Sequence, residues 1–456
     1  MKTIFTFLIA ASAIFVQATN FTPGNIVVLR IGDGTTTLVS NGVTVPVSLL
    51  EFKPETTQTT ALNSVALNTD TLIGGSYSPV FTLGNSKGEG QLDLSQDGKY
   101  VLAGGYDRPV NLGLGSAGQN QYNAHRYGNK TILKVGKNAE PSYLSFLIAE
   151  DDAKAGRENA GAPRNVVSVD GSAFWAKYSS ESALYITEAA PTVITPTGFS
   201  MTNTVRSLKL YKDKLYSMDV TTGTIDFSTP GLPTAAGATS TTAMPFTPWT
   251  DYVGFVMLDL DPTVDFQGTG YDVIYAAHGA NGIEKYYWDG SSAWMKTATF
   301  SVAGGYSQLT GMVVNGKAVL FTSTNGNGIS SGNSVISFKD NQAYNEAITS
   351  PTITVLATAG ANYGFRGVSF TPETTTLNIT PSAVKTVQAS ELGVYAKKGG
   401  LVIKSSNKAA YKIVNTLGQV VAKGVCTSDN EFVTLKAKGV VIVQISNQAA
   451  KVLLSE

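Results

Sequence analysis

Residues 90–107 read GQLDLSQDGKYVLAGGYD, and the pattern of this stretch returns along the chain, which indicates a repeat fold. One unit consists of an alternating strand, a tight turn at Asp97-Gly98 and a second strand rich in aromatic and small residues. The pattern returns in NVVSVDGSAFWAKY at 165–178, SLKLYKDKLYSMD at 207–219 and GMVVNGKAVLFTS at 311–323. Asp-Gly and Asn-Gly accept the positive φ angles of two-residue turns, so these copies predict β-hairpins.

The spacing of the hairpins predicts an all-β fold, a β-propeller. A further unit of four strands begins at Gly254 and fills the long interval between the third and fourth copies. A propeller blade has four strands in about 40–55 residues, which matches this spacing. A β-sandwich of the same length is the alternative fold, but it does not explain the spacing. We count six blades, with seven as the alternative because residues 55–89 are hard to place. NIVVLRIGDG at 25–34 is expected to pair with FRGVSFTP at 365–372, which would close the ring.

The same region resembles a family. The matching segments, in order, are FTPGNIVVLRIGDG at 21–34, GQLDLSQDGKYVLAGGYD at 90–107, NTVRSLKLYKDKLY at 203–216, GFVMLDLDP at 254–262 and FRGVSFTP at 365–372. They resemble secreted bacterial propeller-like proteins that begin with a PGNIVV strand and end with an RGVSF strand. The resemblance implies a propeller over residues 19–372 and implies no activity, because none is assigned to that family.

The C-terminal residues resemble the sorting domain of proteins exported by the type IX (Por) secretion system of Bacteroidetes-type bacteria. The matching pieces are LGQVV at 417–421, Thr434–Leu435 and the strand from Gly439 to Ile445. The resemblance implies a small Ig-like β-sandwich at 385–456 after a linker at 373–384, with the type IX machinery as its partner. It also implies a secreted or outer-membrane surface location.

The N-terminal residues have the pattern of a signal peptide. Lys2 gives a positive start, Ile4 to Val16 is mainly apolar, and cleavage is expected after Ala18. The apolar run is shorter than the roughly 20 residues that a membrane-spanning helix needs. A buried N-terminal helix is the alternative, and no later segment is long and apolar enough to span a bilayer.

Composition is typical of a β-rich chain and argues against nucleic-acid binding. Lys and Arg together number 33, as do Asp and Glu, and charged residues are only 14% of the chain. The tail is rich in lysine, but neither part carries the clustered basic footprint of a nucleic-acid-binding surface. The only cysteine, Cys426, cannot form an intrachain disulfide, so burial and sheet pairing must stabilise the fold.

Three arginines form the first candidate site. Arg164, Arg206 and Arg366 each stand at the start of an inner-type strand, in RNVVSV, RSLKL and RGVSF. Equivalent positions of successive blades converge at one rim of the central channel, where three guanidiniums would bind a carboxylate or phosphate. The alternative, which we favour, is that each arginine ties its blade to the next.

Three acids form the second candidate site. Asp259, Asp261 and Asp265 in DLDPTVDF make the densest acidic signal, and such oxygen-rich loops can bind calcium. The spacing lacks the glycine and terminal glutamate of an EF-hand, so a solvated turn is the favoured alternative. The two histidines, His125 and His278, have no zinc-ligand spacing.

Two classes of function remain open. No catalytic constellation is recognisable, which favours a surface protein over an enzyme. Such a surface protein would bind a glycan, a peptide or another partner, or have a purely structural role, and the sequence does not distinguish these. The alternative is a secreted hydrolase or lyase that uses the propeller channel.

Overall fold

The computed structural model shows two units, Met1–Ile379 and Thr380–Glu456, built from β-strands. None of its described residues forms a helix that could cross a membrane. It describes residues 20–39, 43–73, 76–85, 88–112, 129–147, 161–179, 181–200, 202, 204–220, 222–245, 252–279, 281–301, 305–324, 332–379, 385–386, 393–404, 409–416, 418–436, 439–445 and 448–454. The predicted signal peptide and His125 lie outside these residues.

The first unit is a six-bladed propeller of antiparallel sheets. The first blade contains β27 (Gly364–Phe370), β1 (Ile26–Ile31), β2 (Val45–Phe52) and β3 (Asn63–Ala66). The second contains β7 (Asp93–Leu94), β8 (Val101–Tyr106), β9 (Lys130–Val135) and β10 (Pro141–Phe146). The third contains β11 (Pro163–Ser168), β12 (Ala173–Tyr178), β13 (Leu184–Thr187) and β14 (Ala190–Pro196).

The other three blades follow the same order. The fourth contains β15 (Val205–Tyr211), β16 (Lys214–Asp219), β17 (Thr224–Thr229) and β18 (Thr239–Pro245). The fifth contains β19 (Tyr252–Leu258), β20 (Val273–His278), β21 (Gly282–Trp288) and β22 (Trp294–Ser301). The sixth contains β23 (Thr310–Val314), β24 (Lys317–Ser323), β25 (Ser334–Asp340) and β26 (Thr352–Thr358).

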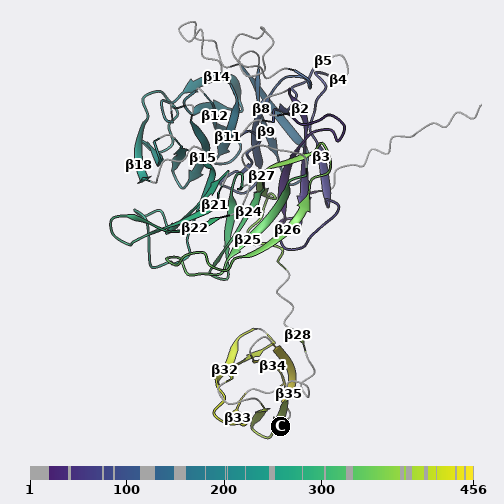
Figure 1. Ribbon diagram of the computed structural model, residues 1–456, viewed down its shortest axis with the longest axis vertical. Helices are drawn as coiled ribbons and strands as arrows, with labels where there is room; N and C mark the ends of the chain where they lie inside the picture. Colours follow the sequence, from purple (N-terminus) through teal and green to yellow (C-terminus); the bar gives the residue numbers. More distant parts are fainter. Residues whose placement is uncertain are drawn as a thin grey trace, which may run out of the picture. The chain divides into compact units, whose positions relative to one another are not determined.

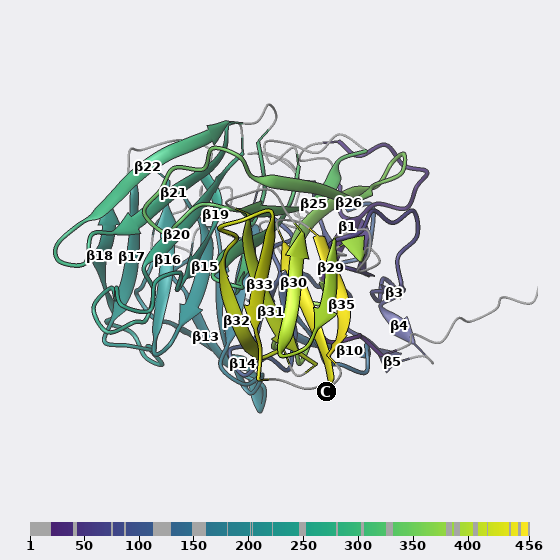
Figure 2. The same ribbon diagram turned by 90° about the horizontal axis from the view of Figure 1, so that it is seen from below.

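The blades surround a common centre. Figure 1 shows β11, β15 and β27 near that centre and β14, β18, β22 and β26 at the periphery. Figure 2 shows β15 to β18 and β19 to β22 following one another across their blades. The propeller prediction is therefore confirmed.

The described residues of the stretch 55–89, which suggested a seventh blade, do not form one. They supply β3 to the first blade, the small hairpin of β4 (Leu72–Ile73) and β5 (Ser76–Tyr77), and β6 (Thr82–Leu83). The short strand β6 pairs with both β2 and β8, so the first two blades belong to one nine-stranded sheet.

The four predicted hairpins form, but two of them have longer turns than the two-residue turn expected. Leu94 pairs with Val101 around Asp97-Gly98. Ser168 pairs with Phe174 around Asp170-Gly171.

Asn315 and Gly316 have φ angles of 52° and 70°, and Val314 pairs with Lys317 across them. This is the two-residue turn that needs positive φ at both central positions. Lys212 is the first residue of the turn between the paired residues Tyr211 and Lys214, and it also has a positive φ, of 53°. A turn without Asn or Gly at its first position therefore closes this hairpin.

The ring closes through strands from the two ends of the propeller. β1 pairs with β27, with Ile26 opposite Phe370 and Val28 opposite Val368. Gly24 N also donates to Thr374 Oγ1 at 2.8 Å, although 350 residues separate the two. The predicted composite blade is confirmed.

The hydrophobic core lies between the faces of neighbouring blades. Val28 and Val368 of the first blade, for example, pack with Val319 and Phe321 of the sixth. Burying one such side chain is worth roughly 1.5–3 kcal/mol, so each blade depends on its neighbours for most of its stability. One buried ion pair adds to this packing, between Lys285 Nζ of the fifth blade and Asp340 Oδ2 of the sixth at 2.8 Å.

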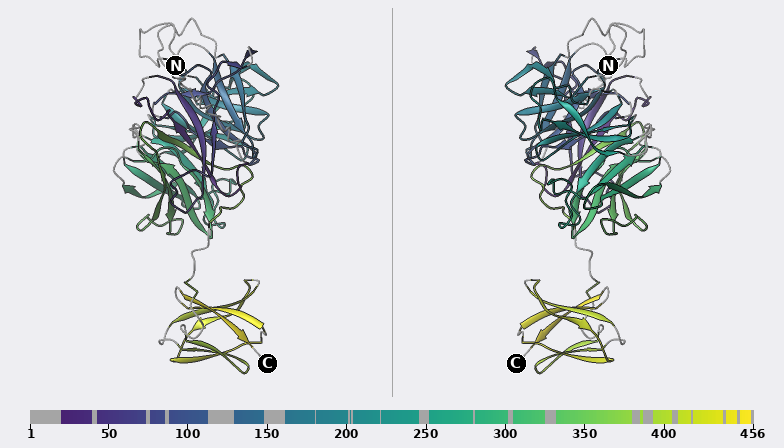
Figure 3. Two further views of the ribbon diagram at one scale, coloured as in Figure 1. Left: turned by 90° about the vertical axis from the view of Figure 1, so that its right-hand side faces the viewer. Right: turned by 90° about the vertical axis from the view of Figure 1, so that its left-hand side faces the viewer.

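The second unit is a two-sheet sandwich, which Figure 3 shows edge-on. Leu401 and Ile403 from one sheet pack with Ile413, Val441 and Val443 from the other. The larger sheet contains β28 (Lys385–Thr386), β35 (Gln448–Leu454), β34 (Gly439–Ile445), β31 (Ala410–Asn415) and β32 (Val420–Val425). The smaller contains β29 (Val394–Lys397), β30 (Gly400–Lys404) and β33 (Asn430–Thr434). The predicted small C-terminal sandwich is confirmed.

Candidate functional site

The innermost strands of four blades carry a β-bulge at the same place. Pairing is interrupted at Arg164 of β11, Arg206 of β15, Val253 of β19 and Arg366–Gly367 of β27. Bulges re-aim side chains and backbone groups. The three predicted arginines therefore occupy equivalent positions near the start of their inner strands.

The residues Gly88–Leu92, which we call the channel segment, run along the ring of bulges. A Cβ atom on Gly88 would lie 3.0 Å from Arg164 Nη1, and one on Gly90 would lie 3.0 Å from Arg366 Cβ. Gly90 O accepts a hydrogen bond from Gly367 N at 2.8 Å. Glycines are needed here both for this close approach and for their positive φ angles of 81° and 76°.

The channel segment also bonds to the remaining blades. Gln91 Nε2 donates to the carbonyl oxygens of Arg206 and Val253, at 2.5 and 2.9 Å. Leu92 N donates to Gln308 Oε1 of the loop before β23, at 2.7 Å. The chain itself thus fills this end of the channel, so the end is not an open passage.

Glu89 is the buried acid of the channel segment. It is 3% exposed and accepts hydrogen bonds from Gly84 N at 2.7 Å and from Tyr106 Oη at 3.1 Å. Burial lowers the pKa of Arg164, and burial lowers the pKa of Arg366 to about 10; the carboxylate of Glu89 opposes both shifts. The buried carboxylate of Glu89 therefore favours the charged form of both guanidiniums.

The geometry fits the structural interpretation for one of the three arginines. Arg366 is buried, and its Nη2 donates to Asn85 Oδ1 at 2.6 Å. Arg164 and Arg206 are partly exposed. The blade ties that we favour from the sequence therefore stay a prediction for the three arginines.

A pocket lies further along the same inner strands. It has a volume of about 360 Å³ and is lined by strands of five blades. Its lining residues are Asp93, Leu94, Gln96, Val167, Lys209, Leu210, Tyr211, Val256, Met257, Leu258, Tyr271, Leu309, Thr310, Gly311, Met312 and Val313. A mainly apolar pocket with a few converging polar groups is the usual form of a small-molecule site.

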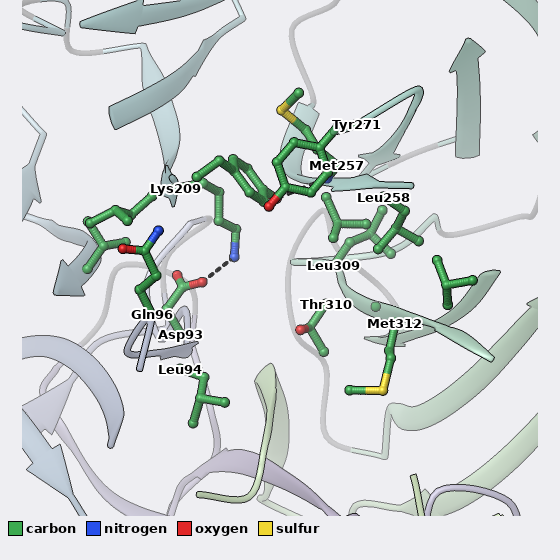
Figure 4. A pocket seen from close by; sticks show the side chains of 16 residues that line it. Asp93, Leu94, Gln96, Lys209, Met257, Leu258, Tyr271, Leu309, Thr310 and Met312 are labelled. Carbon is green, nitrogen blue, oxygen red and sulfur yellow. Dashed lines mark hydrogen bonds and ion pairs between the residues drawn. The ribbon is translucent and has the colours of Figure 1, made fainter. Parts of the chain in front are cut away.

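An ion pair forms the polar part of the pocket. Lys209 Nζ lies 2.5 Å from Asp93 Oδ1, and only 7% and 13% of the two side chains are exposed (Figure 4). Asn165 Nδ2 donates to the other carboxylate oxygen of Asp93. Burial raises the pKa of Asp93, although Lys209 and Asn165 both act in the opposite direction.

Aromatic and sulfur-containing side chains form the opposite wall. The rings of Tyr211 and Tyr271 meet edge to face with centroids 5.1 Å apart. Tyr211 Oη accepts a hydrogen bond from Met257 N at 2.9 Å, which fixes the ring between the fourth and fifth blades. Figure 4 shows Met257 beside Tyr271, and Leu309 and Met312 further round the cavity.

Sequence reasoning missed this pocket, although a signal was present. Asp93 in QLDLS and Lys209 in SLKLY are charged residues within inner strands that are otherwise mainly apolar. Each stands shortly before the turn of its hairpin, so the repeat places them at similar heights in the inner strands of the second and fourth blades. Opposite charges in such positions predict a pair across the channel.

The structure does not gather the three acids proposed for calcium. Asp261 Oδ1 accepts from Thr263 N at 3.0 Å, and Asp265 Oδ1 accepts from Gly270 N at 2.6 Å, so both carboxylates brace their own loop. Within the described part of the chain, no group of three or more His, Cys, Asp or Glu could hold a metal ion. This geometry fits the solvated turn, and calcium at Asp259, Asp261 and Asp265 stays a prediction.

His278 and Cys426 are both buried. His278 Nδ1 accepts from Asn281 N at 3.0 Å and so shapes the turn after β20. Burial raises the pKa of the Cys426 thiol. Neither residue lines the pocket.

One family model and several solved structures are similar to parts of the chain. Residues 381–454 match the family model of a domain of unknown function, DUF6383. No curated protein sequence matches the chain significantly. Virginiamycin B lyase from Staphylococcus aureus is a similar solved structure, at 12% identity over 72% of this chain and 89% of that chain, with a TM-score of 0.37. Another is PorZ, a surface component of the type IX secretion system of Porphyromonas gingivalis, at 11% identity over 92% of this chain and 70% of that chain, with a TM-score of 0.31. Similarities at this level say nothing about a shared ligand or activity.

Proposed function

We propose that the protein is an exported binding protein. Its propeller holds a ligand in the pocket between the inner strands, and its C-terminal unit directs it through type IX secretion to the cell surface. The observation that carries the binding role is the pocket of about 360 Å³ at the centre of the propeller, with one buried ion pair in an apolar lining.

Two features of the chain support the export role. The N-terminal pattern from Lys2 to Ala18 is that of a signal peptide. The strands that resemble a sorting domain include β33 and β34, which belong to a separate unit with its own core. The DUF6383 match covers this unit but assigns it no role.

The described residues give the hydrolase or lyase alternative no added support. That alternative would gain support if the arginines and the acids lay on one rim, but Arg206 and Val253 stand near the start of their inner strands, whereas Asp259 follows the end of β19. In the pocket, Lys209 is held by Asp93, so it is placed as a hydrogen-bond donor and not as a nucleophile.

Export is tested in a bacterium that has the type IX system. The full chain should reach the surface and be cleaved by added protease on intact cells. A chain that stops after Ile379 should stay in the periplasm with the tryptophan fluorescence of the folded propeller. Surface delivery of the shortened chain would contradict the sorting role.

A further inference from the structure

We propose that the pocket binds a small, uncharged and mainly apolar ring compound that carries one hydrogen-bonding end. This inference rests on the proposed binding function and specifies the ligand class.

The size of the pocket favours a small molecule over a polymer. Its volume of about 360 Å³ is near the lower end of the range for small-molecule sites, about 300–1,000 Å³. The channel segment occupies the axis beyond it, where Gln91 and Leu92 are bonded to the surrounding blades. A ligand therefore enters a closed-ended pocket, which suits a compact molecule better than a threaded peptide or glycan chain.

The charges of the pocket favour an uncharged ligand. Among the described residues that line it, Asp93 and Lys209 are the only charged ones, and they neutralise one another at 2.5 Å. A ligand carboxylate or sulfonate would meet Asp93, and a ligand ammonium would meet Lys209. Either ion would also lose its hydration without gaining an unmatched partner, which is a large cost in a buried site.

The walls favour a ring. Met257 and Met312 supply polarizable thioethers that adapt to irregular shapes and make favourable contacts with aromatic rings. Tyr211 and Tyr271 supply aromatic surface, and aromatic pairs prefer edge-to-face or offset contacts. A ring compound can therefore pack against both kinds of side chain.

The polar part of the pocket accounts for the hydrogen-bonding end. A lysine ammonium has three N–H donors, and one of those of Lys209 points at Asp93 Oδ1. Gln96 Nε2 donates to Lys212 O at 2.7 Å, which turns its carbonyl oxygen to other partners. An N–H or hydroxyl group on the ligand could bond here without carrying charge.

Two dyes with one ring skeleton test the charge preference on the full chain. N-phenyl-1-naphthylamine is uncharged and has one N–H group, whereas 1-anilinonaphthalene-8-sulfonate adds a sulfonate. We expect saturable fluorescence enhancement by the uncharged dye at one site, with at least tenfold weaker binding of the sulfonate.

Two substitutions locate the site. Met312→Trp should fill the pocket and weaken binding of the uncharged dye at least tenfold. Met295→Trp is the matched control, because Met295 is 44% exposed on β22, and it should leave binding unchanged. Asp93→Asn removes one charge of the pair, so the sulfonate dye should bind several-fold more tightly. Circular dichroism melts establish that each variant is folded.

The outcomes separate the two proposals. If the sulfonate dye binds more tightly to the unmodified protein and Met312→Trp abolishes that binding, the ligand class is wrong but the pocket is a binding site. If Met312→Trp affects neither dye in a folded protein, the pocket is not a ligand site and the binding function falls with it.

Discussion

Replacing Arg366 by methionine should destabilise the propeller by about 1.5–3 kcal/mol, because the hydrogen bond of a buried guanidinium is lost. Methionine keeps an apolar stem but removes a positive charge that Glu89, which is 3% exposed, stabilises. The lost bond is the one that Nη2 donates to Asn85 Oδ1 at 2.6 Å. A hydrogen bond to a charged group is worth about 1.5–3 kcal/mol.

Urea unfolding followed by tryptophan fluorescence measures this cost. The four tryptophans all precede residue 380, so the signal reports on the propeller and not on the C-terminal unit. Lys99→Met is the control: Lys99 is 64% exposed in its pair with Asp97, and its loss should leave the midpoint unchanged.

A double-mutant cycle with Glu89→Gln tests the cause. If the two charges stabilise one another, the double variant should lose less stability than the sum of the single losses, by about 0.5–3 kcal/mol. Additive losses, or a cost below about 1 kcal/mol for Arg366→Met, would refute the assignment of Glu89 and Arg366 as a blade tie.

Three further outcomes are expected from the same fluorescence assay. Gly367→Ala should lower the free energy of unfolding by about 1–3 kcal/mol, because the new Cβ would lie 2.4 Å from Gly90 O. Gly360→Ala is the control, because its Cβ would meet only Tyr363 at 3.5 Å. Equal effects of the two substitutions would contradict this packing. Burial lowers the pKa of Lys177 to about 7, so the unfolded chain binds more protons than the folded chain above that pH. Stability should therefore rise from pH 7 towards pH 10. The same dependence of stability on pH in a Lys177→Met variant would disprove this. Val28→Asp should prevent folding because Val28 is fully buried at the ring closure, while Val193→Asp, at a position 64% exposed, should fold normally.

The hairpins and the ring closure could be predicted because both depend on local chemistry. Asn315-Gly316 fixes a turn by its own φ preferences, and the mainly apolar strands on either side of it pair directly. The pairing of β1 with β27 followed from apolar strands at both ends of one repeat array, which would otherwise leave an open edge.

The channel contacts could not be predicted in the same way. In the sequence, the residues from Gly90 to Ser95 resemble an ordinary inner strand. In the structure only Asp93–Leu94 form the strand β7, and Glu89 lies before it. Which acid stabilises the charge of Arg366 depends on how the blades are arranged around the axis, and no local pattern records that. The Asp93–Lys209 pair depends on the same arrangement, although the charges themselves were visible.

The pairing of β1 with β27 also means that the ring cannot close until β27 has been synthesised. β1 ends at Ile31 and its closing partner begins at Gly364. At about 5–20 residues per second, a ribosome needs roughly 20–70 s to make the residues between them. Throughout that delay β1 has one unpaired edge, which can pair with other chains until the closing strand is present.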